Sequence, residues 1–288
     1  MSMSHLHTPV LGWYVENARD LPWRRPGATP WAVMVSEFML QQTPVARVLP
    51  VFESWMATWP TPSALAAAPS GAAVRAWGRL GYPRRALRLH AAASAIVDRH
   101  GGEVPSAYDE LMALPGVGDY TASAIASFAF GARHAVLDTN VRRVLARAVN
   151  GTEFPAATVT KAERALADSL VPDEQPATWA VAVMELGALV CTAASPSCGV
   201  CPIRDRCAWN TAGRPAYDGP ARRGQAWAGT DRQVRGRLMA VLRDTEGSVA
   251  RTRLDAAWPD SVQRERALQS LLVDGLVVET DGRYALPT

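Results

Sequence analysis

Hydrophobic residues recur at intervals of three and four from residue 8 to about residue 190, which predicts a series of amphipathic helices. Five segments carry this spacing most clearly: WAVMVSEFMLQQT, ALRLHAAASAIVDRH, TASAIASFAF, NVRRVLARAV and ATWAVAVMELGALV. Proline and glycine interrupt the pattern at short intervals, so the helices should be short. Strand-like alternation does not stand out in this part of the sequence. The pattern therefore predicts an all-α domain of about ten helices.

The end of the chain has a different pattern. Residues 211–230 are rich in Gly, Pro and Arg, which is typical of a linker. Three helical segments then precede LVVETDGRYALP, which predicts a β-hairpin with its turn at Asp281 and Gly282. Three helices and a hairpin indicate a small winged-helix-like α+β module over residues 231–288. A generic helical cap is the alternative interpretation.

Composition narrows the class of protein. Hydrophobic content of 48% and charged content of 20% are those of a soluble globular protein. No apolar run approaches the roughly 18 residues of a membrane helix, and the polar start lacks a signal peptide, so we expect a cytoplasmic protein without a membrane partner. A net charge of +3 is a weak indication of a nucleic-acid partner. Lys161 is the single lysine, so a reaction that needs a lysine amine must use this residue or the N-terminus.

All four cysteines lie in the segment CTAASPSCGVCPIRDRC, residues 191–207, with the spacing C-x6-C-x2-C-x5-C. A reducing compartment disfavours disulfides. Zinc sites usually contain two CxxC pairs or nearby histidines, whereas this segment contains one CxxC and no histidine. The spacing alone leaves zinc and an iron–sulfur cluster as alternatives.

The segment LPGVG, residues 114–118, separates a predicted helix that ends near Met112 from one that begins near Asp119. Its glycines permit a tight backbone, and the N–H groups at the start of the second helix suit a phosphate. This arrangement is typical of a helix–hairpin–helix that grips the DNA backbone, and an ordinary helix–turn–helix corner is the alternative. Four residues of the hairpin are the predicted DNA contacts: Leu114, Gly116, Val117 and Gly118.

Two carboxyl groups are candidates for catalysis. Glu37 is the one acid in a strongly apolar predicted helix, and burial there raises the pKa of a carboxyl until it can deliver a proton. A place on the wet face of the helix is the alternative. Asp138 begins a helix, where the helix N-terminus should keep its pKa low and the carboxylate ionised. A purely structural helix cap is the alternative for Asp138.

The motifs SEFMLQQT, LGYPRRALRLH, LPGVGDYTASAIASFAFG, LDTNVRRVLAR and MELGALVC resemble, in order and spacing, the MutY-type adenine DNA glycosylases of the helix–hairpin–helix, endonuclease III superfamily. The resemblance covers roughly residues 10–210. It implies a mainly α glycosylase domain over residues 8–190, and a loop over residues 191–210 that holds a four-iron, four-sulfur (4Fe-4S) cluster. It also implies a monomeric, monofunctional enzyme of base-excision repair, associated with the nucleoid. Such an enzyme flips adenine out of double-stranded DNA, opposite 8-oxoguanine or guanine, and hydrolyses its N-glycosidic bond.

The resemblance assigns roles to individual residues. Glu37 matches the general acid that protonates adenine N7, and Asp138 matches the carboxylate that stabilises the oxocarbenium-like sugar. Asn140 matches an Asn beside that carboxylate, and Tyr120 lies near the sugar where bifunctional relatives have a Schiff-base lysine. Gln42 and Tyr82 match the duplex wedge, and Thr43 matches a polar contact beside it. Leu21, Trp23 and Arg24 match the rim of the adenine pocket. The residues that match the cluster ligands are Cys191, Cys198, Cys201 and Cys207. Arg204 and Arg206, in the loop that the cluster fixes, are predicted to meet phosphates, with a solvated loop as the alternative.

Two departures from the family bear on specificity. Ala180 and Val181 stand where the family often has Asn followed by Gln or Glu, and residues 231–288 are too few for the Nudix-like domain of many members. Glu185 is the only acid on the same helix, and either an arginine-paired or a pocket role fits it. A thymine or uracil mismatch glycosylase of the same fold is therefore the second hypothesis. A non-catalytic DNA-damage-binding or redox-sensing protein is the third.

Overall fold

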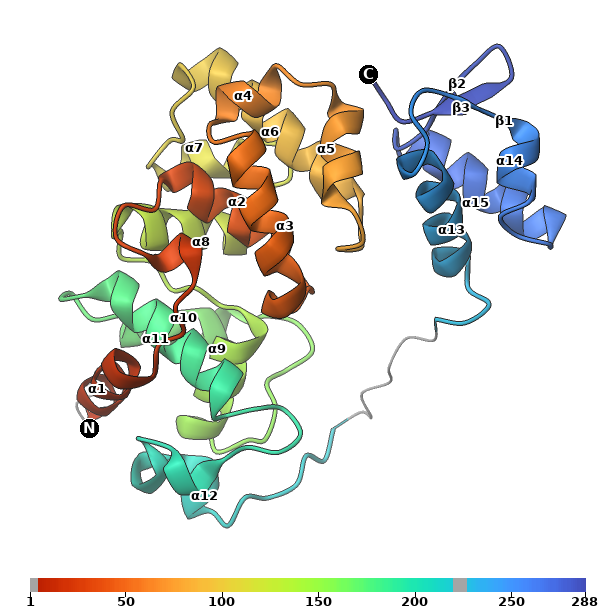
Figure 1. The fold of residues 1–288 in the computed structure, drawn as a ribbon. Helices are drawn as coiled ribbons and strands as arrows, with labels where there is room; N and C mark the ends of the chain where they lie inside the picture. Colours follow the sequence, from red (N-terminus) through yellow and green to blue (C-terminus); the bar gives the residue numbers. More distant parts are fainter. Residues whose placement is uncertain (1–4, 220–226) are drawn as a thin grey trace. The chain divides into compact units, whose positions relative to one another are not determined.

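The computed structural model, drawn as a ribbon in Figure 1, describes residues 5–219 and 227–288. The chain divides into two compact units. The first unit consists of Met1–Val33, Ser106–Ala113 and Val117–Ala221, and the second of Met34–Pro105, Leu114–Gly116 and Arg222–Thr288. The fold is mainly helical, as predicted. Residues 220–226 of the predicted linker lie outside the described residues, and the domain boundaries expected from the sequence stay predictions.

The core of the first unit forms where α1 and α9 pack against α11. Trp179, Val183 and Leu186 follow each other at helical spacing on α11, so they lie on one face of this helix, in a core shared with residues of α1 and α9. The helices of this unit are α1 (His7–Asn17), η2 (Pro22–Arg24), α7 (Tyr108–Met112), α8 (Asp119–Phe130), α9 (Thr139–Ala148), α10 (Lys161–Leu170), α11 (Pro176–Leu189), η3 (Cys198–Val200), η4 (Arg204–Arg206) and α12 (Ala208–Thr211). Helix α2 (Pro30–Leu40) begins in the first unit and continues into the second.

The second unit contains α3 (Val45–Thr58), α4 (Pro62–Ala66), α5 (Ser70–Trp77) and α6 (Arg84–His100). Helix α6 buries Ala86, Leu89, Ala93 and Ile96, a stripe at intervals of three and four that matches the predicted period. The buried rings of Trp55 and Trp77 meet edge to face, with centroids 5.7 Å apart. This stripe and these aromatic rings give α6 a fixed place beside α4 and α5.

The predicted hairpin between α7 and α8 is present: α7 ends at Met112 and α8 begins at Asp119. Gly116 has φ +77°, a left-handed conformation, and a Cβ there would lie 2.6 Å from Cβ of Arg88 on α6. Only glycine can adopt this positive φ at little cost and also avoid the close contact with Arg88 without a shift of the backbone. The turn is therefore fixed by packing against α6 as well as by its own sequence.

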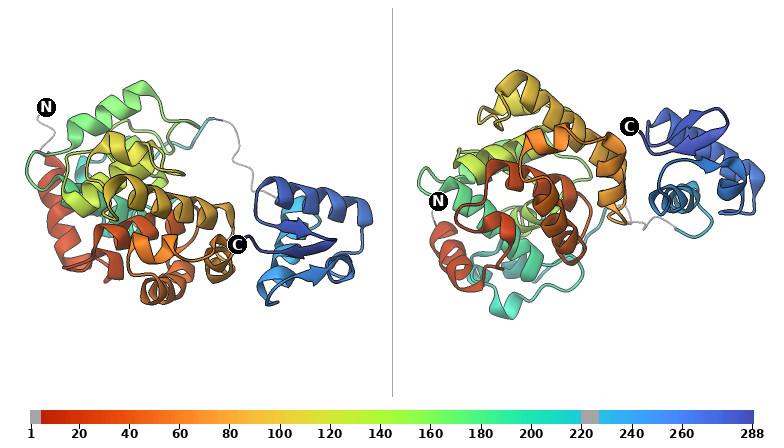
Figure 2. Two further views of the ribbon diagram at one scale, coloured as in Figure 1. Left: turned by 90° about the horizontal axis from the view of Figure 1, so that it is seen from above. Right: turned by 45° about the horizontal axis from the view of Figure 1, so that its top comes forward.

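The C-terminal residues form the three helices and hairpin expected from the sequence, together with one strand that the sequence did not indicate. The elements are α13 (Asp231–Arg243), β1 (Val249–Ala250), α14 (Arg251–Asp255), α15 (Ser261–Val273), β2 (Val278–Thr280) and β3 (Arg283–Ala285). The strands make an antiparallel sheet in the order β1-β3-β2, of which β2 and β3 are drawn in dark blue in Figure 2. Asp281 and Gly282 both have positive φ, as a two-residue hairpin turn requires. At two residues, β1 is too short to show an alternating pattern.

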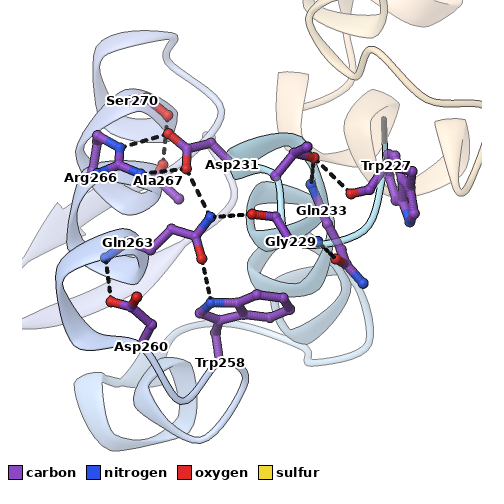
Figure 3. A network of polar contacts seen from close by, with 11 residues as sticks. Trp227, Gly229, Asp231, Gln233, Trp258, Asp260, Gln263, Arg266, Ala267 and Ser270 are labelled. Atoms are coloured by element: carbon purple, nitrogen blue, oxygen red, sulfur yellow. Dashed lines mark hydrogen bonds and ion pairs between the residues drawn. The ribbon is translucent and has the colours of Figure 1, made fainter. Parts of the chain in front are cut away.

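Polar side chains join the start of α13 to α15 in this module (Figure 3). Gln263 donates to the Gly229 carbonyl at 2.8 Å and accepts from Nε1 of Trp258 at 2.8 Å. Arg266 makes two hydrogen bonds of 2.7 Å to the carboxylate of Asp231. These contacts fix the two helices relative to each other, and they occupy Arg266 within the module.

Candidate active site and cysteine loop

Asp138 lies immediately before α9 and caps this helix. Its Oδ1 accepts a 2.6 Å hydrogen bond from the Val141 N–H, and its Oδ2 accepts a 2.7 Å bond from Nδ2 of Asn140. Both groups donate, so both favour the ionised carboxylate. The cap expected from the sequence is therefore present, and Asn140 is part of it.

The pKa of Asp138 differs from the sequence-based prediction. A helix N-terminus was expected to keep it low, but burial raises the pKa of this carboxyl above its ordinary value. The hydrogen bonds from Val141 and Asn140 lower the pKa and offset only part of that effect. The reason for the correction is that Asp138 lies in a poorly solvated place, where the charged form costs more than the sequence indicates.

An arginine connects Asn140 to the cysteine loop. Nη2 of Arg143 donates to Oδ1 of Asn140 at 2.8 Å and to the Gly187 carbonyl at 2.7 Å, and its Nε donates to the Cys191 carbonyl at 2.6 Å. Because Arg143 holds the oxygen of the Asn140 amide, the nitrogen of that amide is directed to Asp138. A Cβ at Gly187 would lie 2.7 Å from Cβ of Asn140, so this glycine allows α11 to approach α9 closely.

Tyr120 lies on α8 beside a small apolar cluster of Ala124, Val136 and Ala180. Ala180 is one of the two residues that stand where the related family often has polar side chains. It is 5% exposed, and it packs into this cluster. The sequence predicts that the polar contact of the related family is missing at this position, and the structure places an apolar surface beside Tyr120 there.

Glu185 on α11 is a buried anion of the first unit. Its side chain is 0% exposed and makes ion pairs with Arg19 at 2.6 Å and Arg24 at 2.9 Å. Arg19 also donates its backbone N–H, and these donors hold the pKa of Glu185 at about 2 against the opposing effect of burial. Arg19 and Arg24 flank Leu21 and Trp23, so one carboxylate fixes both ends of the predicted pocket rim to α11. The arginine-paired interpretation of Glu185 is confirmed.

Replacing Glu185 by Gln should lower the free energy of unfolding by about 3 kcal/mol, because two half-buried cations lose their anion. The folded-state pKa lies below 4.5, the ordinary value for a glutamate, so these ion pairs stabilise the fold above that pH and are lost as pH falls toward 2. Urea unfolding at pH 7 and pH 3 measures both effects. Glu174→Gln, at an exposed site in the same unit, is the control and should unfold like the unaltered chain.

Glu37, Gln42, Thr43 and Tyr82 belong to the second unit. Glu37 lies on α2 and is 4% exposed, so the wet-face alternative is wrong. Thr43 is 6% exposed, and its hydroxyl donates to the Leu80 carbonyl at 3.3 Å. Gln42 and Tyr82 are exposed, Tyr82 by 41%, and each has a positive φ.

The four cysteines line one pocket between α9, α11 and the loop that follows α11. Every one of them is a free thiol, so the disulfide alternative is wrong. Nη1 of the buried Arg147 lies 3.4 Å from Sγ of Cys191, and its guanidinium covers the Trp209 ring at 4.7 Å. Within the described residues, no three His, Cys, Asp or Glu side chains are arranged to hold a single metal ion. Arg204 and Arg206 are exposed beside this pocket.

A family model now adds to this geometry. The model of the HhH-GPD superfamily of base-excision DNA repair proteins matches residues 35–170, which include Glu37, the hairpin and Asp138. An adenine DNA glycosylase of Mycobacterium tuberculosis is 56% identical over 283 residues, which span 97% of this chain and 93% of the relative. The chain belongs to the adenine DNA glycosylase family.

Other members of the adenine DNA glycosylase family extend the match. The Mycolicibacterium smegmatis enzyme is 54% identical over 99% of this chain and 97% of its own length. The human enzyme is 42% identical over 69% of this chain but 38% of its own length. The bacterial relatives therefore share the C-terminal region of this chain, whereas the match to the human protein is confined to a part of each chain.

Solved structures of related repair enzymes share the fold. A thermostable thymine-DNA glycosylase matches with a TM-score of 0.67 and 25% identity, over 73% of this chain and 97% of its own. A trapped endonuclease III–DNA covalent intermediate matches with a TM-score of 0.62 and 22% identity, over 75% of this chain and 100% of its own. At 22% identity, the likeness to the endonuclease III intermediate concerns the fold alone.

The sequence pattern did not identify several residues that belong to the site of this family member. Arg19, Arg85 and Arg143 each bind groups far away along the chain, and Arg19 lies 166 residues from Glu185. A sequence pattern does mark Arg143 and Arg147: they are four residues apart on the face of α9 that carries buried apolar residues. Lys161 is exposed at the start of α10. No helix among the described residues is long and apolar enough to cross a membrane.

Proposed function

We propose that this chain removes adenine mispaired with 8-oxoguanine or guanine from double-stranded DNA, by hydrolysis of the N-glycosidic bond. The observation that carries the proposal is the half-buried Asp138 carboxyl, oriented by Val141 and Asn140 in a member of the adenine DNA glycosylase family. Tyr120, on α8 of the same unit, is assigned to the sugar side of the proposed site. The enzyme acts as a monomer.

In the proposed mechanism, Glu37 protonates adenine N7, which makes the base a better leaving group. Positive charge then develops on the deoxyribose, and the ionised Asp138 stabilises it. The two carboxyls need opposite protonation states near neutral pH. Burial on an apolar helix suits a protonated Glu37, and the two donors at Asp138 favour its ionised form against the burial that raises its pKa.

The sugar side of the site offers no amine. Tyr120 stands at the position of the Schiff-base lysine in bifunctional relatives, and Lys161 is an exposed residue at the start of α10. We therefore propose a monofunctional enzyme that leaves the abasic strand intact. Borohydride added during the reaction should trap no covalent complex; a trapped complex with strand scission would refute this assignment.

Four groups of residues are proposed to bind the duplex. The hairpin residues Leu114, Gly116, Val117 and Gly118 contact the phosphate backbone, and Gln42 and Tyr82 enter the base stack with Thr43 beside them. Leu21, Trp23 and Arg24 form the rim of the adenine pocket. Arg204 and Arg206 meet phosphates, which their exposure supports.

Base release from four duplexes tests the proposal: A:8-oxoguanine, A:G, T:G and U:G, each incubated with the full chain. Adenine should be released from the first two, and thymine and uracil should be retained. Release of thymine or uracil would support the second hypothesis, a thymine or uracil mismatch glycosylase. Two observations favour this alternative: the likeness to a thymine-DNA glycosylase and the apolar Ala180. Binding of the duplexes without release of any base would support the third hypothesis, a non-catalytic DNA-damage-binding or redox-sensing protein.

The four cysteines suit a 4Fe-4S cluster. They line a single pocket, and Nη1 of Arg147 donates toward Sγ of Cys191. We propose that Cys191, Cys198, Cys201 and Cys207 are the ligands. When bound, the cluster supplies iron–thiolate bonds that fix the loop, while Arg143 and Arg147 attach the loop to α9.

Cys198→Ser should cost the protein its broad visible absorbance near the blue end of the spectrum, because one of four thiolates is lost. Iron and sulfide analysis of the purified protein checks the stoichiometry. Ser197→Ala, at the neighbouring position, is the control and should keep the colour. A colourless protein with stoichiometric zinc would refute the cluster and restore the zinc alternative.

A further inference from the structure

Two exposed residues of the second unit have a left-handed backbone although neither is glycine. Gln42, just after α2, has φ +55°, and Tyr82, just before α6, has φ +47°. This conformation costs a residue with a side chain about 1 kcal/mol or more, so surrounding contacts must hold it in place. The two residues are also the predicted duplex wedge.

Arg85 supplies those contacts to both loops at once. Its side chain is buried, with the residue 4% exposed. Nη1 donates to the Gln41 carbonyl at 2.6 Å and to two carbonyls in the last turn of α2. Nη2 donates to Thr43 Oγ1 at 2.9 Å and to the Gly81 carbonyl at 3.0 Å. Gln41 and Gly81 directly precede the two strained residues, so one guanidinium fixes the peptide oxygen before each of them.

The chemistry of the guanidinium suits this task. Its two terminal nitrogens lie at a fixed separation in one plane, so the two loops are held at a fixed separation too. The rings of Trp77 and Tyr82 lie 5.2 and 5.6 Å from its centre. Burial lowers the pKa of Arg85 to about 10, so the group stays cationic at neutral pH. A lysine has one ammonium group, which cannot bridge both loops in this way.

We propose that Arg85 is a positioning residue for opening the duplex. It holds the exposed tips Gln42 and Tyr82 together as a single rigid element. This inference rests on the proposed function. Entering a base stack costs a few kcal/mol of stacking. A pair of tips that is ordered before binding does not add the cost of its own ordering to that step. Arg85 itself contacts neither the base nor the sugar.

Base extrusion measured apart from base release tests this role. A duplex with 2-aminopurine opposite 8-oxoguanine becomes fluorescent when the 2-aminopurine leaves the stack, and Asp138→Asn in the same chain prevents its release. In this background Arg85→Lys should reduce the extruded fraction at least about tenfold, which corresponds to the loss of one charge-assisted hydrogen bond. Arg99→Lys, at an exposed site on the same helix, is the matched control and should extrude the base normally.

A role in stability alone is excluded by counting only folded protein. Circular dichroism and urea unfolding give the folded fraction, and extrusion is compared at saturating enzyme. Normal extrusion by folded Arg85→Lys would overturn the proposal. If that variant does not fold, Thr43→Val removes one acceptor of Nη2 and should reduce extrusion by a smaller factor; normal extrusion there would also overturn it.

The result is separable from the proposed function. If the unaltered chain extrudes 2-aminopurine and Arg85→Lys extrudes less, but no adenine is released from A:8-oxoguanine, the proposed function fails and the role of Arg85 stands. If the unaltered chain releases adenine and the Arg85 and Thr43 variants extrude the base normally, the role of Arg85 fails and the proposed function stands.

Discussion

Asp138→Asn is expected to slow adenine release from an A:8-oxoguanine duplex by about 10³-fold, the scale of removing one preorganised charge from an active site. Two effects add. The variant lacks the negative charge that faces the developing positive charge on the sugar. It also turns an amide N–H₂ toward Nδ2 of Asn140, whose own amide is held in place by Arg143. Single-turnover release at saturating enzyme measures the chemical step without the contribution of binding.

The control for this variant is Asp168→Asn, which alters an exposed carboxyl on α10 of the same unit. Duplex binding by fluorescence anisotropy should be unchanged in both variants. Because burial raises the pKa of Asp138, the rate of the unaltered enzyme should fall with decreasing pH at a pH above the ordinary carboxyl range. A variant that retains the full rate, with binding intact, would remove Asp138 from the mechanism.

Glu37→Gln is expected to slow release by about 10²- to 10⁴-fold, the usual contribution of a general acid. The amide keeps the size of the side chain in its buried place on α2, but it has no acidic proton to deliver to adenine N7. Single-turnover release at saturating enzyme measures the chemical step.

A modified substrate isolates the role of Glu37. In 7-deazaadenine a carbon replaces N7, so the base cannot accept the proton, and the unaltered enzyme and Glu37→Gln should be equally slow on it. Glu53→Gln, at an exposed site on α3, should behave like the unaltered enzyme on adenine. If Glu37→Gln releases adenine at the full rate, another group is the acid.

Local features were accessible from the sequence because they depend on neighbours in the chain. The bounds of the hairpin at Met112 and Asp119 follow from helical spacing interrupted by proline and glycine. The turn at Asp281 and Gly282 follows from the demand for positive φ at both residues. The cap at Asp138 follows from the preference of Asp for the first position of a helix.

Features that depend on distant partners were not accessible in this way. The pKa of Asp138 is set mainly by burial, which the fold creates, and the prediction from the helix N-terminus had the wrong direction. Arg85 carries no mark in the sequence, since its acceptors are backbone carbonyls up to 47 residues away. Strand β1 has two residues and exists because β3 pairs with it.

The exposed Lys161 offers a practical route to watching this protein search DNA. An amine-reactive dye can attach to the side chain of Lys161 or to the N-terminal amine, because the chain has no other lysine. Lys161→Arg leaves the N-terminus as the single point of attachment, so the two labels can be compared. Single-molecule tracking of the labelled enzyme on stretched DNA then needs no engineered cysteine, and the four thiols near α11 stay untouched.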